Sequence, residues 1–215
     1  MSLFNAALRA NQLGRCGRSL SLVLGLAMAA TLGLTACEPL GFSAAKPAFH
    51  GIDITGATYA RTLSLPDQNG QPRSLADFKG KVVVVFFGYT QCPDVCPTTM
   101  VELAQVKKAL GKDGERLQGL FVSIDPERDT PAILKAYMSS FDPSFIALRG
   151  SVEQAQAAAK EFKVFFAKVP GKTESSYTID HTAGAYVFDA NGKARLFVRY
   201  GAGAEALTAD IKALL

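Results

Sequence analysis

An unbroken apolar run at residues 82–87 limits the fold of this chain more than any other feature. The run consists of four valines and two phenylalanines and therefore has no polar face. Such a segment fits a parallel strand whose two faces are both covered by other elements. A second run of this kind lies at residues 120–124. Between the two runs, apolar residues recur at helical spacing, at Met100, Leu103, Val106 and Leu110. The pattern predicts an α/β fold.

The remaining segments extend this alternation of strands and helices. In chain order we expect a hairpin at 61–65 and 73–75, a helix from Pro131, a strand at 145–148, a helix from Ser151 to about 162, a hairpin at 185–188 and 194–198, and a helix from about 204 to 215. This order is typical of a thioredoxin-like fold, in which helices flank a central mixed sheet. We therefore predict such a fold with an additional N-terminal hairpin.

The first 36 residues have the composition of an export signal rather than of a folded domain. An apolar run at residues 19–34 follows a basic segment, and no acidic residue precedes Glu38. The basic residues of that segment are Arg9, Arg15 and Arg18. The run is slightly short and poorly flanked for a membrane-spanning helix. We predict a lipoprotein-type signal peptide at residues 1–36.

The end of this signal suggests how the protein is held at a membrane. Leu34, Thr35, Ala36 and Cys37 resemble the lipobox of bacterial lipoproteins, which implies that Cys37 is lipidated and becomes the first mature residue. An uncleaved N-terminal anchor helix is the alternative. Residues 37–58 are rich in Ala, Gly and Pro and predict a membrane-proximal tether, and residues 59–215 have the length of one domain. We expect an exported, membrane-anchored protein that faces the periplasm.

The charge of the chain gives no support for nucleic-acid binding. The formal net charge of +4 includes the three arginines of the signal, so the mature chain is close to neutral. No basic stripe remains in the predicted domain. Of the four cysteines, Cys16 and Cys37 belong to the signal and its processing site. Only Cys92 and Cys96 are left for the domain.

Cys92 and Cys96 lie where the first apolar strand leads into the following helix. Pro97 suits the first helical turn, and the unpaired N–H groups there should make the Cys96 thiol ionise more easily than a free one. The spacing of four allows a disulfide or a shared metal ion. Three residues intervene rather than two, and the wider loop favours metal chelation. A purely structural disulfide across so short a loop would add little stability.

His181 is the candidate third ligand. It lies in a polar segment, predicted to be a loop, beside Asp180, which either orients its ring or ends a strand. The other histidine, His50, belongs to the tether and is expected to be solvated. Two thiolates and one imidazole favour Cu(I). Zinc ranks second, because structural zinc normally takes four protein ligands and no fourth is evident.

Three motifs in order along the chain resemble the Sco/SenC family. The first comprises residues 87–90 and 92–99, the second residues 123–131 and the third residues 177–182. The likeness begins near Phe49 and runs almost to the C-terminus. The resemblance implies a membrane-tethered copper chaperone that binds copper, mainly as Cu(I) with Cu(II) as the alternative, through Cys92, Cys96 and His181. It further implies delivery to the dinuclear copper site of cytochrome c oxidase subunit II, after loading by a periplasmic donor.

An enzymatic function is the competing interpretation. Cys92 and Cys96 would serve equally well as the redox-active pair of a periplasmic thiol-disulfide oxidoreductase that reduces the cysteines of the target copper site. A peroxidase is less consistent with the sequence, because Pro93 stands where peroxiredoxins carry Thr or Ser. The charged segment at residues 125–129 could contribute to function at a strand end. The simpler interpretation, a helix cap with solvated charges, is favoured.

Overall fold

The computed structural model describes residues 48–173 and 176–215. The predicted signal peptide at residues 1–36, Cys37 and most of the predicted tether lie outside the described residues. Within the described ranges, no helix combines the length and the apolar character needed to cross a bilayer.

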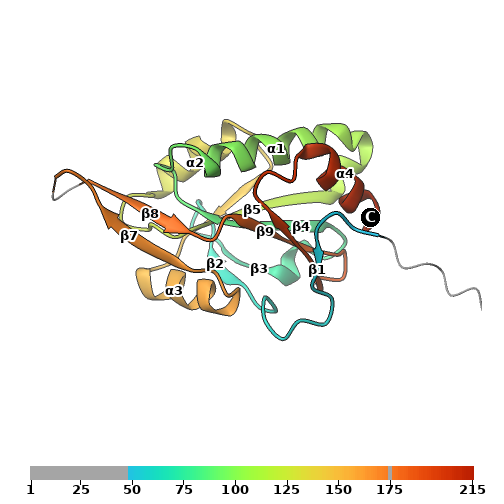
Figure 1. Ribbon diagram of the computed structural model, residues 1–215, viewed down its shortest axis with the longest axis horizontal. Coiled ribbons are helices and arrows are strands. Elements are labelled where there is room, and N and C mark those ends of the chain that lie inside the picture. Colours follow the sequence, from blue (N-terminus) through green and yellow to red (C-terminus); the bar gives the residue numbers. More distant parts are fainter. Residues whose placement is uncertain (1–47, 174–175) are drawn as a thin grey trace, which may run out of the picture. The chain divides into compact units, whose positions relative to one another are not determined.

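A six-stranded mixed sheet forms the centre of the fold (Figure 1), with the strand order β1-β10-β9-β4-β5-β6. Its strands are β1 (Ile52–Asp53), β4 (Val82–Gly88), β5 (Leu117–Ser123), β6 (Ile146–Leu148), β9 (Gly184–Phe188) and β10 (Ala194–Arg199). β4, β5 and β6 run parallel, whereas β9 is antiparallel to both β4 and β10. The predicted thioredoxin-like fold with a central mixed sheet is confirmed.

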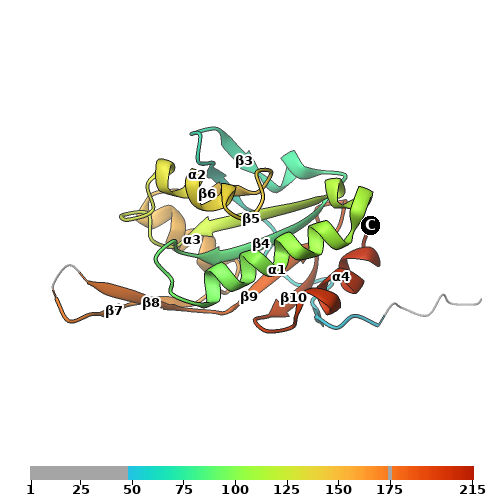
Figure 2. The same cartoon turned by 90° about the horizontal axis from the view of Figure 1, so that it is seen from above.

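Helices cover both faces of this sheet, which explains the apolar runs in the sequence. The helices are α1 (Val95–Ala109), α2 (Pro131–Ser139), α3 (Val152–Glu161) and α4 (Ala204–Lys212), with short 3-10 turns η1 (Leu75–Phe78) and η2 (Gly111–Arg116). Figures 1 and 2 show α1 and α4 on one face, and Figure 1 shows α3 on the other. Every residue of β4 and β5 is consequently buried, as expected of parallel strands covered on both sides.

The helix starts follow the signals in the sequence. Thr130 caps α2, since its side-chain oxygen accepts a hydrogen bond from the Ile133 N–H, and Pro131 takes the first helical position. Ser151 caps α3 in a capping box with Gln154. Both starts were predicted and are confirmed.

The N-terminal hairpin is also confirmed, with β2 (Ser64–Pro66) paired to β3 (Pro72–Ser74). Its turn is closed by Asp67, a buried carboxylate. Asp67 accepts hydrogen bonds from the N–H groups of Asn69 and Gln71 and from Arg73 Nε at 3.0 Å. The terminal β9–β10 hairpin forms as predicted, with Gly192 in its turn at a positive φ of 74°.

A further hairpin was not predicted. β7 (Phe166–Pro170) pairs with β8 (Tyr177–His181) in antiparallel fashion, with Phe166 opposite His181, and the pair extends away from the main sheet (Figures 1 and 2). The expected polar loop around His181 is therefore wrong, because His181 is the last residue of a strand. Tyr177, Ile179 and His181 are less exposed than Thr178 and Asp180 between them, the alternation of a half-buried strand.

The end of the predicted tether packs on the domain. Ile52 and Asp53 pair with Phe197 and Leu196 at the edge of the sheet. The backbone N–H groups of His50 and Gly51 each donate to the buried carboxylate of Asp210 at 2.8 Å. Ordered packing thus begins before the domain boundary expected at Tyr59.

Candidate metal centre

The structure brings the three predicted ligands together at one end of the sheet. The donor atoms of Cys92, Cys96 and His181 all lie within 4.8 Å of one another. Cys96 Sγ and His181 Nε2 are 3.6 Å apart, although the two residues are 85 positions apart in the sequence. Both cysteines are free thiols. The arrangement offers two sulfurs and one nitrogen to a single ion.

A close backbone approach places Cys96. Its side chain, in the first turn of α1, is fully buried against Gly88 at the end of β4. A Cβ atom on Gly88 would lie 2.8 Å from Cys96 Sγ and 2.9 Å from ring atoms of Phe86 and Phe121. Only glycine leaves room for the thiol at this position.

The ionisation of Cys96 differs from the expectation. Burial raises the pKa of the Cys96 thiol well above its usual range, and this outweighs a hydrogen bond from the Tyr89 backbone that lowers the pKa. The predicted easy ionisation at the helix start is therefore wrong, because desolvation of the thiolate exceeds the effect of the helix N-terminus. At neutral pH the metal-free protein carries a thiol here, whose proton a metal ion must displace.

Cys92 belongs to the loop between β4 and α1 and is half-buried. Its N–H donates to the Tyr89 carbonyl. The neighbouring Thr90 donates to Asp129 Oδ1 through both its backbone N–H, at 3.1 Å, and its hydroxyl, at 2.6 Å. These contacts hold the loop that carries Cys92 against the second motif, residues 123–131. Cys92 is thus the more accessible of the two sulfurs.

His181 is held in a form suited to ligation. Its Nδ1 lies 3.1 Å from the carbonyl of Thr182. In the tautomer that donates this hydrogen bond, Nε2 keeps its lone pair and points toward Cys96. The rings of Phe86 and Tyr89 make edge contacts with the imidazole. Burial lowers the pKa of His181, against smaller raising effects of Thr182 and Asp180, so the ring is neutral at physiological pH.

The ring is therefore oriented by the Thr182 carbonyl. Asp180, the orienting partner considered from the sequence, is exposed and pairs with Ala167 across the β7–β8 hairpin. Its charge still raises the pKa of His181.

The charged segment at residues 125–129 is not the solvated helix cap that was favoured. Asp125 and Asp129 are buried, and the cap of α2 is Thr130. Besides Thr90, Asp129 accepts a hydrogen bond from the Ser123 hydroxyl at 2.6 Å. The segment therefore forms an internal support for the loop that carries Cys92. Charged residues are rarely buried without partners, which is why the sequence pattern suggested exposure.

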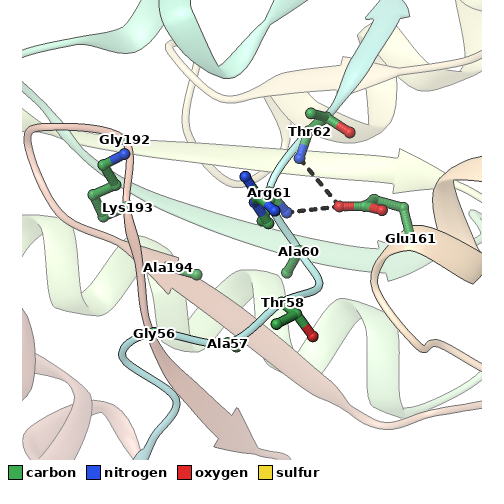
Figure 3. Close-up of a pocket in the computed structure, with 10 residues that line it drawn as sticks. All are labelled: Gly56, Ala57, Thr58, Ala60, Arg61, Thr62, Glu161, Gly192, Lys193 and Ala194. Carbon is green, nitrogen blue, oxygen red and sulfur yellow. Dashed lines mark hydrogen bonds between the residues drawn. The ribbon is translucent and has the colours of Figure 1, made fainter.

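The remaining candidates lie apart from this centre. His50 is 59% exposed at its side chain, and its Nδ1 is 3.2 Å from Asp210 Oδ1. A hollow of about 520 Å³ opens beside residues 56–62 and the β9–β10 turn (Figure 3). Its lining includes Arg61 and Lys193 but no large apolar side chain, and Glu161 there already accepts hydrogen bonds from backbone N–H groups. The hollow contains none of the three donors.

The donor set fits a soft ion of low coordination number. Two sulfurs and one imidazole nitrogen match the preference of Cu(I). Cys92 leaves the site partly open, whereas structural zinc sites are closed by four ligands. Thiol exchange would have to begin at half-buried Cys92, because the buried thiol of Cys96 is the less accessible nucleophile. The convergence of three donors, of which the imidazole has no part in thiol exchange, therefore favours metal binding as the main chemistry.

Comparisons with known proteins agree with these observations. A family model described as SCO1/SenC matches residues 53–215. A SCO2-like protein of Rickettsia felis is 40% identical over 130 residues, which make up 60% of this chain and 63% of that protein. The chain spans less than two thirds of the length of this and other curated relatives that it matches.

Solved structures show the same likeness. Bradyrhizobium japonicum ScoI with copper bound is 42% identical and superposes with a TM-score of 0.66, covering 72% of this chain and 98% of that one. Apo Sco1 of Thermus thermophilus, solved in solution, is 37% identical with a TM-score of 0.70, covering 80% of this chain and 99% of that one.

Proposed function

Because the chain belongs to the SCO1/SenC family, we propose that it is a copper carrier that binds one copper ion through Cys92, Cys96 and His181. The convergence of the three donor atoms within 4.8 Å is the observation that carries this proposal. Relatives from Bradyrhizobium japonicum and yeast have been solved with copper bound, which supports copper as the cargo.

The residues of the site suit a carrier that must release its ion. Cys96 is the buried ligand of the site, whereas Cys92 and His181 are both half-buried. An acceptor thiolate or imidazole would approach from the side of these two ligands and replace one of them before the buried Cys96. A three-ligand site permits such an exchange, whereas a closed site of four ligands would oppose it.

We further propose that the acceptor is the dinuclear copper site of cytochrome c oxidase subunit II, and that a periplasmic donor loads the protein. This part rests on the resemblance of the three sequence motifs to the Sco/SenC family, which implies such an acceptor. The composition of residues 1–37 supports export and attachment to a membrane through lipidated Cys37. Mass spectrometry of the mature protein tests the attachment. An unmodified Cys37 in a chain that retains Met1 would contradict it.

Reduction of the target's cysteines is a second candidate function, favoured by the two neighbouring free thiols. A disulfide between Cys92 and Cys96 would remove both thiolates and release the metal, so that one pair of residues could serve both functions. Copper retained unchanged after oxidation would argue against this coupling.

A copper titration of the reduced protein tests the main proposal. Wild type should bind one equivalent of Cu(I), and Cys92→Ala, Cys96→Ala and His181→Ala should each weaken binding strongly. His181→Ala should leave disulfide exchange largely intact, because both thiols remain. Failure of the reduced wild type to bind copper would refute the carrier function, and an unchanged affinity of His181→Ala would favour the exchange enzyme.

A further inference from the structure

Arg128, in the second motif, contacts both segments that supply the metal ligands. Its side chain is only 17% exposed. Nε donates to the buried carboxylate of Asp125. Nη1 donates to the Tyr177 carbonyl at 2.9 Å and to Gln91 Oε1 at 3.1 Å. Gln91 immediately precedes Cys92, and Tyr177 begins the strand that ends at His181.

Arg128 and its partner Asp125 hold Tyr177 at several points. The guanidinium lies over the Tyr177 ring, 3.5 Å from its centroid, and the Tyr177 hydroxyl donates to Asp125 Oδ1 at 2.7 Å. Tyr177 is therefore held by its backbone, its ring and its hydroxyl. β8 is five residues long, so a fixed Tyr177 restricts where His181 can lie at the other end of the strand.

A second connection lies on the same side of the hairpin. The Ile179 N–H donates to the Tyr89 hydroxyl at 3.1 Å, and the Tyr89 ring contacts both His181 and Arg128. Tyr89 belongs to the segment that leads to Cys92. The histidine strand is thus attached to the cysteine loop at Tyr177 and at Ile179, with Arg128 against both attachments.

The chemistry of Arg128 argues against a role in packing alone. Burying a guanidinium is costly, and the cost is offset only when its N–H donors have hydrogen-bond partners. Because Arg128 Nη2 is buried without a hydrogen-bond partner among the described residues, this cost is not fully offset. The planar fork and the flat face of arginine suit simultaneous hydrogen bonding and stacking, which an apolar residue or lysine cannot reproduce.

We propose that Arg128 is a positioning residue of the metal site, which holds the His181 strand against the Cys92 loop so that the imidazole reaches the ion. This inference rests on the proposed copper site. It assigns to the second motif a defined task, although none of its residues is a predicted ligand.

Arg128→Gln tests the proposal, with Arg195→Gln as the matched control. Arg195 is 23% exposed, pairs with Asp189 and lies near the Phe49 ring, away from the three ligands. Arg128→Gln should weaken copper binding by about 10- to 100-fold, the usual effect of losing a residue that orients a metal ligand. In the Cu(II)-loaded protein it should also diminish the nitrogen hyperfine coupling of His181 in the EPR spectrum. Arg195→Gln should change neither quantity.

A metal-free measurement tests the proposal independently of the copper function. In the reduced apo protein, Arg128→Gln should speed amide exchange in β8 by at least about tenfold relative to β4, and Arg195→Gln should not. Gln91→Ala, a change at an exposed side chain, serves if Arg128→Gln does not fold, and it should likewise weaken copper binding and speed amide exchange in β8 relative to wild type. The positioning role would be overturned if wild type binds copper and both test variants keep the wild-type copper affinity, EPR spectrum and β8 amide exchange. The proposed copper site would remain intact in that case. Absence of copper binding by wild type would instead refute the proposed function, while the apo measurement still decides the role of Arg128.

Discussion

At the residue scale, the metal centre depends on side chains whose environment the sequence does not display. The residue types and spacing of Cys92, Cys96 and His181 were sufficient to predict a three-donor set. The burial of Cys96 was not predictable, because it arises from the close approach of Gly88, which lies on a different element. The same holds for Asp125 and Asp129, whose partners Tyr177 and Thr90 come from distant segments.

Gly88→Ala should disturb the thiol directly. The added methyl group would lie 2.8 Å from Cys96 Sγ, and overpacking of this kind costs about 1 to 3 kcal/mol of unfolding free energy. Gly119→Ala is the matched control, because its Cβ would meet Phe145 at 2.8 Å instead. Urea unfolding should show both variants destabilised. Copper titration should show weaker binding for Gly88→Ala only, and equal binding by both variants would contradict the role given to Gly88.

At the element scale, apolar runs and turn or cap signals in the sequence predicted strands and helices correctly, whereas the short polar strands were not predicted. The buried strands β4 and β5 and the capped helices α2 and α3 matched the predictions because each has a strong local signal. The β7–β8 hairpin has a weaker signal, the alternation of Tyr177, Ile179 and His181 with polar residues, over only five positions. That alternation could have identified the strand. The placement of β8 beside the cysteine loop depends on tertiary contacts, such as those of Arg128 with Tyr177 and Gln91, that no local pattern encodes.

The β2–β3 hairpin gives a pH-dependent prediction. Burial raises the pKa of Asp67, but hydrogen bonds from Gln71, Arg73 and Asn69 outweigh this effect and lower the pKa below its usual value of 3.8. The carboxylate therefore stabilises the fold above about pH 3.8, and this stabilisation is lost as the pH falls through the lowered pKa.

Asp67→Asn should lower the unfolding free energy by about 1 to 3 kcal/mol at neutral pH, since hydrogen bonds to a charged group are lost. The difference from wild type should shrink below about pH 3.8. Denaturant unfolding across this pH range measures it, with Asp113→Asn, at a 61% exposed side chain, as the control. A difference that stays constant with pH would refute the assignment.

At the scale of the whole molecule, the fold joins two distant chain segments at one end of a rigid sheet. The cysteines follow the central strand β4, and His181 arrives on a hairpin outside the main sheet. The second motif lies between them and supports both. The first and third motifs thus carry the proposed ligands, and the second motif supports both. A site of three residues therefore depends on segments spread over most of the domain.

Copper loading should therefore stabilise the whole domain. A ligand that binds only the folded state adds about 2.7 kcal/mol when its free concentration is 100 times its Kd, which raises Tm by roughly 5 to 10 °C for a domain of this size. Calorimetry in a Cu(I) buffer should show this shift for reduced wild type and a much smaller one for His181→Ala. An equal shift in both proteins would indicate copper bound elsewhere.

X-ray absorption spectroscopy of the reduced protein loaded with one equivalent of Cu(I) tests the central claim most directly. Three-donor binding predicts two sulfur atoms and one nitrogen atom in the first coordination shell, with the nitrogen lost in His181→Ala and one sulfur lost in Cys92→Ala. A wild-type shell that contains sulfur alone, or one that His181→Ala leaves unchanged, would contradict the proposed site.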